Sequence, residues 1–112
     1  MTAPLISVVL PVFNGGAYLE RAVRSVLIQD HADFELIAID DGSRDESLAV
    51  LRGLERRDPR MRVIARDNRG LVYTLNEGLA LAQAPFVARM DADDISYPTR
   101  FSRQVAAFRR NP

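Results

Sequence analysis

The residues of this sequence best suited to chemistry are acidic, and they lie in two short runs. Asp91-Ala92-Asp93-Asp94 places three carboxylates within four positions, and Asp40-Asp41 places two side by side. Carboxylates this close repel one another when water is excluded, so the longer run favours a bound cation. Mg²⁺ or Mn²⁺ suits it, because such an ion takes one or two protein carboxylates and fills its other positions with water and phosphate oxygens. The run therefore predicts a divalent metal and a phosphate-bearing ligand.

Structural roles for the same residues stay open at this point. Asp94 could compensate the dipole of the helix that follows it, in a solvated acidic turn. Asp41 could cap a helix together with Ser43 instead of meeting a ligand. A calcium loop of the EF-hand type is excluded, because a loop that began at Asp91 would carry Ser96 at its glycine position.

Composition excludes several classes of function. The 112 residues include 15 basic and 15 acidic ones, so no overall charge draws the chain to nucleic acid. Cysteine is absent, which removes disulfides, zinc-thiolate sites and thiol nucleophiles. Every basic residue is arginine, which excludes a Schiff-base lysine and a phosphate-binding loop with its lysine. The sequence shows neither a signal peptide nor a membrane span, and we expect a cytoplasmic protein.

Alternating strands and helices must position the acidic runs. Apolar runs rich in β-branched residues predict four buried strands, at residues 5–10, 34–39, 61–65 and 85–90. Apolar residues at helical spacing predict four helices. The first covers residues 19–29, and the second begins at a capping box formed by Ser43 and Glu46. The third covers residues 71–82, and the fourth begins at about Pro98. The predicted fold class is α/β, a three-layer α/β/α arrangement around a mostly parallel, Rossmann-like sheet.

Ligands of open α/β sheets bind at the carboxyl ends of the strands, where the loops converge. The polar segments at these ends are residues 11–14, 40–43, 67–70 and 91–94. Asp41 is placed where its carboxylate could accept a hydrogen bond from a nucleobase. Phe13 could stack on a base or a ribose, or belong to the core. Together the segments predict one ligand site along this rim.

The motifs taken together resemble the inverting bacterial glycosyltransferases of family two, which have the fold called GT-A. The resemblance is carried by Val-Val-Leu-Pro-Val-Phe-Asn (8–14), Ile-Asp-Asp-Gly-Ser (39–43), Asn-Arg-Gly-Leu (68–71), Leu-Asn-Glu-Gly-Leu (75–79) and Met-Asp-Ala-Asp-Asp (90–94). Residues 88–101 are most similar to members that assemble exopolysaccharide or lipopolysaccharide. The order and spacing of the motifs cover nearly the whole chain.

The resemblance implies a set of nucleotide-sugar-binding residues, namely Pro11, Val12, Phe13, Asn14, Asp41, Asn68, Gly70, Asp91, Ala92 and Asp93. Asp41 would contact the base, usually uracil. Asp91 would face the ribose, and Asp93 would be the chief ligand of Mn²⁺ or Mg²⁺, with Asp91 also counted as a metal ligand. Leu75 departs from many relatives, which carry a basic residue there, so a phosphate contact at this position is in doubt.

The resemblance also implies the reaction and its partners. A sugar would pass from a UDP-sugar to a saccharide or lipid-linked saccharide acceptor in polysaccharide synthesis, at the cytoplasmic face of the inner membrane for the full-length protein. Residues 1–112 would be the donor-binding part of a longer domain, with no catalytic base before Pro112 and no activity alone. We expect this truncated chain to expose Phe101, Val105 or Phe108 and to form a symmetric homodimer.

Three other classes of function make different demands on the sequence. A sugar-nucleotide nucleotidyltransferase would need a glycine-rich phosphate loop and a lysine, which this sequence lacks. A glycoside hydrolase would need two carboxyl groups on either side of the sugar bond, whereas adjacent aspartates suit a metal better. A non-catalytic module that binds a nucleotide or a protein remains the alternative.

Overall fold

The computed structural model of the protein describes residues 4–30 and 33–110, and the side chain of Phe108 lies outside the described set. Within these residues the strands form one sheet, in the order β3-β2-β1-β4, and all paired strands are parallel. The strands are β1 (Ile6–Val12), β2 (Phe34–Asp41), β3 (Met61–Arg66) and β4 (Phe86–Arg89). The helices are η1 (Gly16–Tyr18), α1 (Leu19–Leu27), α2 (Ser47–Glu55), α3 (Leu71–Leu81) and α4 (Arg100–Arg110).

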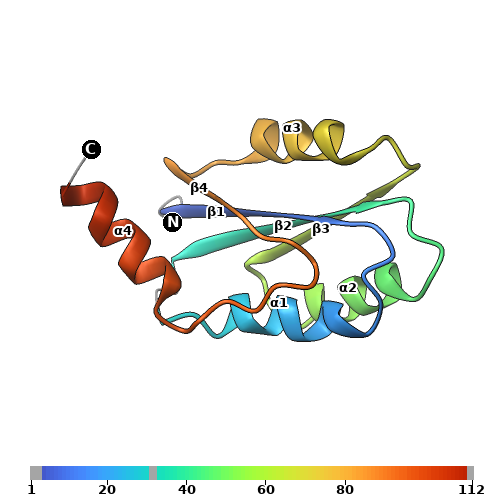
Figure 1. The fold of residues 1–112 in the computed structure, drawn as a ribbon, viewed down its shortest axis with the longest axis horizontal. Helices are drawn as coiled ribbons and strands as arrows, with labels where there is room; N and C mark the ends of the chain where they lie inside the picture. Colours follow the sequence, from blue (N-terminus) through green and yellow to red (C-terminus); the bar gives the residue numbers. More distant parts are fainter. Residues whose placement is uncertain (1–3, 31–32, 111–112) are drawn as a thin grey trace.

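Helices cover both faces of the sheet, which confirms the predicted α/β class and its three layers. Figure 1 shows α1 and α2 below the sheet, α3 above it, and α4 beside the end where β1 begins. The loops that leave β1, β2 and β3 turn together at the opposite end, on the right of the view. In the described part of the chain, no helix is long and apolar enough to cross a membrane.

Continuous apolar runs explain the two central strands. All residues of β2 are buried except Glu35, and β1 is equally buried up to Leu10. We predicted that the first strand would end at residue 10, and this was wrong, because β1 continues to Val12. The Val9 carbonyl accepts a hydrogen bond from the Met90 N–H, on the side of β1 where β4 lies. The backbone nitrogen of Pro11, two residues later, faces this same side. β4 has ended there, and the missing N–H of proline costs the sheet nothing.

The predicted capping box of Ser43 and Glu46 was also wrong. Glu46 stands at the N-cap position of α2 but makes no side-chain capping bond. Asp45 performs that role, since its Oδ1 accepts a hydrogen bond from the Ser47 N–H at 2.9 Å. The Ser43 hydroxyl instead accepts the main-chain N–H of Asn14 at 2.8 Å and so joins two loops. A tertiary contact has replaced the local cap.

The last helix differs from expectation in what it exposes. Phe101 is fully buried and Val105 nearly so, although we expected an exposed apolar face there. The Phe101 ring packs edge-on against Phe34, with ring centroids 5.6 Å apart. α4 therefore closes the core at the amino ends of the strands, and the predicted homodimer lacks the support that exposure of these side chains would have given. Phe108, the third residue of that prediction, has a side chain outside the described set.

Candidate functional site

A pocket of about 250 Å³ lies at the carboxyl ends of β1 and β2, beside the first turn of α3. It is lined by Pro11, Val12, Phe13, Asp41, Asn68, Gly70, Leu71 and Thr74. A larger hollow of about 700 Å³ shares Phe13 and Asn68 with it and adds Asn14, Gly42, Arg44 and Asp67. Seven of the ten predicted site residues therefore line two adjoining hollows.

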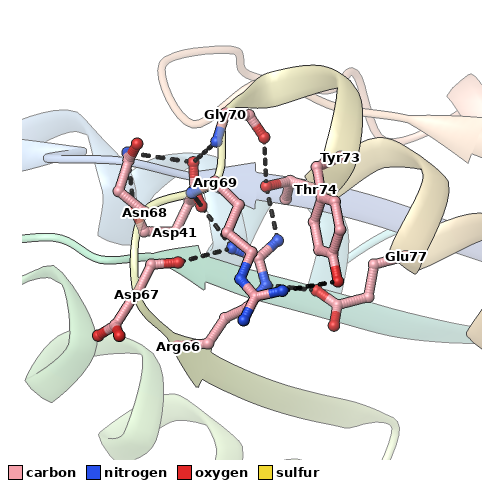
Figure 2. A network of polar contacts seen from close by, with 9 residues as sticks. All are labelled: Asp41, Arg66, Asp67, Asn68, Arg69, Gly70, Tyr73, Thr74 and Glu77. Atoms are coloured by element: carbon pink, nitrogen blue, oxygen red, sulfur yellow. Dashed lines mark hydrogen bonds and ion pairs between the residues drawn. The ribbon is translucent and has the colours of Figure 1, made fainter.

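Asp41 is the most constrained polar residue of the pocket. Its Oδ1 accepts hydrogen bonds from the Arg66 guanidinium and from the Arg69 N–H at 2.7 Å. Its Oδ2 accepts the Gly70 N–H at 3.1 Å and the Asn68 amide at 3.2 Å, as Figure 2 shows. Two carboxylate oxygens offer about four acceptor directions, so these bonds use all of them.

The same contacts keep the Asp41 carboxylate ionised. Burial by itself would raise the pKa of Asp41, since the charged form loses water. The hydrogen bonds from the Arg69 and Gly70 main chain and from the Arg66 guanidinium outweigh burial and lower the pKa below its usual value. Asp41 is therefore a fixed anion in the wall of the pocket at neutral pH. The alternative role for Asp41, capping a helix together with Ser43, is not what the structure shows, because Asp41 instead holds the turn that leads into α3.

The network also contains Arg66, Thr74 and Glu77, which were not among the predicted site residues. Arg66 donates to the Thr74 hydroxyl and to a Glu77 carboxylate oxygen, both at 2.8 Å. Thr74 donates in turn to the Gly70 carbonyl at 2.8 Å. The available signal for the ion pair was a basic residue at the end of β3 and an acidic residue at the end of β2. This signal can be recognised only when the register of the two strands is known, because that register pairs Asp41 with Arg66.

Two glycines allow the turn before α3 to approach β2. Gly70 has φ of 93°, a backbone conformation that residues with a side chain rarely adopt. Gly42 has φ of 78°, and a Cβ built on it would lie 2.6 Å from the Asn68 nitrogen. The chain therefore needs glycine at position 42 for both its conformation and its close contact with the turn.

The loop that follows β1 is tied to the loop that follows β2. Asn14 has φ of 50°, and its side-chain oxygen accepts the Arg44 N–H at 2.8 Å. The Gly15 N–H donates to the Ser47 hydroxyl at 2.9 Å. These bonds fix the loop beside Phe13, which is 53% exposed and lines the pocket. Phe13 therefore does not belong to the core.

The acidic run after β4 is not part of either hollow. Asp91 Oδ1 accepts hydrogen bonds from the Arg89 Nε and Nη2 at 3.2 and 3.1 Å, and both side chains are about half exposed. Asp93 is exposed, and Ala92 packs partly against the core. Asp91, Ala92 and Asp93 thus do not line the two hollows that contain the other seven predicted site residues.

The carboxylates of this acidic run are its only side-chain groups suited to a hard metal ion. Among the described residues, no group of three or more His, Cys, Asp or Glu side chains is placed to hold a metal ion. Two exposed carboxylates suit Mg²⁺ or Mn²⁺ only if water and phosphate oxygens complete the coordination. The run therefore fits a metal shared with a phosphate-bearing ligand, and not one enclosed by protein alone.

Comparison with known proteins places these features in a family. The sequence pattern described as "Glycosyl transferase family 2" matches residues 7–112. An uncharacterized glycosyltransferase of Haemophilus influenzae is 34% identical over 96% of this chain and 34% of its own length. Chondroitin synthase of Escherichia coli is 32% identical over 96% of this chain and 16% of its own length. The chain thus spans about a third or less of these relatives.

Solved structures with the same fold contain nucleotides. S. aureus TarS in complex with UDP-GlcNAc has a TM-score of 0.81 and 27% identity, over 93% of this chain and 30% of that one. Glucosyl-3-phosphoglycerate synthase of Mycobacterium tuberculosis, in complex with Mn²⁺, UDP and glucosyl-3-phosphoglycerate, has a TM-score of 0.74 and 25% identity, over 94% and 39% of the two chains. The parallel α/β fold, the pocket at its strand ends and the match over residues 7–112 agree, and the chain belongs to glycosyl transferase family 2.

Proposed function

We propose that residues 1–112 form the donor-binding part of a glycosyltransferase that moves a sugar from a UDP-sugar to a hydroxyl acceptor, with inversion, in cell-surface polysaccharide synthesis. The observation that carries the proposal is the pocket at the ends of β1 and β2, with an ionised Asp41 in its wall. UDP-GlcNAc in TarS supports the class of donor, and the relative named chondroitin synthase supports a polysaccharide product. We assign no catalytic base within these residues.

The base would be recognised at Asp41 Oδ2. A new donor can reach this saturated carboxylate only if one present donor withdraws. The Asn68 amide is best suited to withdraw, because its bond to Oδ2, at 3.2 Å, is longer than the bonds from the Arg69 and Gly70 N–H groups. The amide also donates to the Asp41 carbonyl at 3.0 Å. Uracil N3–H can replace it, whereas cytosine has an acceptor at that position and would leave the carboxylate without its fourth partner.

The acidic run would act on the diphosphate. Asp93 and Asp91 would hold Mn²⁺ or Mg²⁺, and a bound divalent ion stabilises negative charge on a departing diphosphate. Asp91 must then exchange its contact with Arg89 for the metal. Mn²⁺ beside UDP in the mycobacterial synthase supports a metal at this step. Solvent-exposed ion pairs are weak, so the exchange costs about 1 kcal/mol or less.

Calorimetric titration with UDP tests both parts of the proposal. UDP should bind more tightly with Mn²⁺ than with a chelator, and Asp93→Asn should remove most of that difference. UDP should also outcompete CDP, and Asp41→Ala should remove this preference, which is worth roughly 1 to 3 kcal/mol. Equal affinity with and without metal would refute the metal site, and an unchanged preference in Asp41→Ala would place base recognition elsewhere.

A further inference from the structure

We propose that Arg66 is a positioning residue for nucleobase recognition, because it holds two residues of the pocket wall from outside the pocket and shares its charge with Glu77. In the described part of the chain Arg66 does not line the pocket, but its partners Asp41 and Thr74 both do. The inference rests on the proposed function, since only a pocket that binds a nucleotide can reveal this role.

The guanidinium group joins elements that are distant in the sequence. Nη1 donates to Asp41 Oδ1 and to the Asp67 carbonyl, Nη2 to the Thr74 hydroxyl, and Nε to Glu77 Oε1. Figure 2 shows the group lying between the end of β2 and the first turns of α3. A guanidinium is a rigid planar fork, so these bonds set the orientation of Asp41 relative to α3. A lysine at this position would keep the charge and lose the geometry.

The network is shielded from water. The Arg66 side chain is 14% exposed and that of Asp41 is 7% exposed. The Tyr73 ring covers the guanidinium, with its centroid 5.0 Å from Cζ. Removing Arg66 would leave the buried Asp41 charge without its ion-pair partner and with neutral N–H donors only, which is costly. Arg66 is therefore tightly coupled to the state of Asp41.

The charges in the network do not cancel. Asp41 from β2 and Glu77 from α3 share the single guanidinium of Arg66 from β3, which leaves one net negative charge. The guanidinium of the nearby Arg69 instead contacts the Tyr73 hydroxyl at 3.1 Å. Both guanidinium groups lie over the Tyr73 ring, but only that of Arg66 forms ion pairs with Asp41 and Glu77, so Asp41 shares its paired cation with a second carboxylate. Without Glu77, Arg66 would neutralise Asp41 fully.

Affinities for UDP and CDP test the positioning role. Arg66→Lys should weaken UDP binding about tenfold, on the order of one charge-assisted hydrogen bond, and should bring the ratio of UDP to CDP affinity toward one. Arg62→Lys is the matched control, because Arg62 lies on the same strand and is exposed, and its side chain makes no hydrogen bond or ion pair with the described residues. A purely structural loss would reduce the folded fraction equally for both nucleotides and leave the ratio unchanged.

The pH dependence of UDP-GlcNAc binding gives a second readout, since the diphosphate of this ligand does not titrate between pH 7 and 5. In the wild type the lowered pKa of Asp41 keeps the affinity constant over that range. Arg66→Met removes one of the contacts that lower the pKa of Asp41, while burial, which raises it, remains. The pKa should therefore rise relative to the wild type, and affinity should fall as the pH falls. Glu77→Gln keeps the guanidinium on Asp41 and should show a flat pH profile with UDP binding about threefold weaker.

Each outcome separates the two claims. Wild-type protein that binds neither nucleotide would overturn the proposed function. Wild-type binding with an unchanged nucleotide ratio and pH profile in Arg66→Lys and Arg66→Met would overturn the role of Arg66 alone. If the Arg66 variants do not fold, Glu77→Gln decides, because wild-type UDP affinity in that variant would refute the charge sharing.

Discussion

Replacing Gly42 by alanine should loosen the pocket, and the structure gives the size of the effect. Alanine at φ of 78° pays about 1 to 2 kcal/mol for the left-handed conformation. Its Cβ would also lie 2.6 Å from the Asn68 nitrogen and 3.1 Å from the Asn68 Cα, so the turn must move. Forced shifts of this kind cost about 1 to 3 kcal/mol. We expect Gly42→Ala to lower the free energy of unfolding by about 2 to 5 kcal/mol in total.

Gly16→Ala is the matched control. Gly16 has φ of 62°, but a Cβ there would meet nothing within 4 Å. It should lose only the conformational part, about 1 to 2 kcal/mol. The effect of alanine on the unfolded chain is the same in both variants and cancels. Urea denaturation measures both. Free energies of unfolding that agree within about 0.5 kcal/mol would show that the close approach of Asn68 contributes nothing.

Further predictions concern stability. Gly78→Ala should destabilise the protein by about 1 to 2 kcal/mol, because a Cβ there would lie 2.4 Å from Val9 Cγ1 and the resulting overpacking outweighs the gain in helix propensity. Gly53→Ala, where a Cβ meets nothing within 4 Å, should instead stabilise α2 by up to about 1 kcal/mol, and urea denaturation gives both signs. The Arg60 side chain lowers the pKa of Asp58, so their interaction stabilises the fold above the ordinary aspartate pKa of 3.8 and is lost as pH falls through the lower folded value. Asp58→Asn should therefore cost about 1 kcal/mol at pH 7 and reduce the loss of stability on acidification, as followed by thermal unfolding from pH 7 to 3.

Local sequence patterns were sufficient to predict the strands, the helices and the rim on which the site lies. Buried strands need continuous apolar residues, so their carboxyl ends, and Asp41 at one of them, could be located from the sequence alone. Gly42 and Gly70 stand in turns whose glycines are required by backbone conformation, and such turns are also visible in a sequence. The individual site residues were implied by the resemblance to family-two glycosyltransferases, and seven of the ten line the two hollows at the strand ends.

Contacts between distant segments were not predictable in the same way. The pairing of Arg66 with Asp41 depends on the register of two strands, and a single sequence does not contain that register. Ser43 fitted a local capping pattern but bonds to Asn14, because the tertiary arrangement offered a better partner. Phe101 looked exposed only because the packing of α4 against Phe34 could not be foreseen.

The central claim is that a nucleotide binds at the carboxyl ends of β1 and β2, and amide chemical shifts during a UDP titration test it most directly. We expect the largest shift changes at the N–H groups of Phe13, Asn68 and Gly70, which line the pocket. A separate hollow near Val105 and Arg109 on α4 serves as an internal comparison. Changes centred on that hollow, or none at saturating UDP and Mg²⁺, would contradict nucleotide binding at these strand ends.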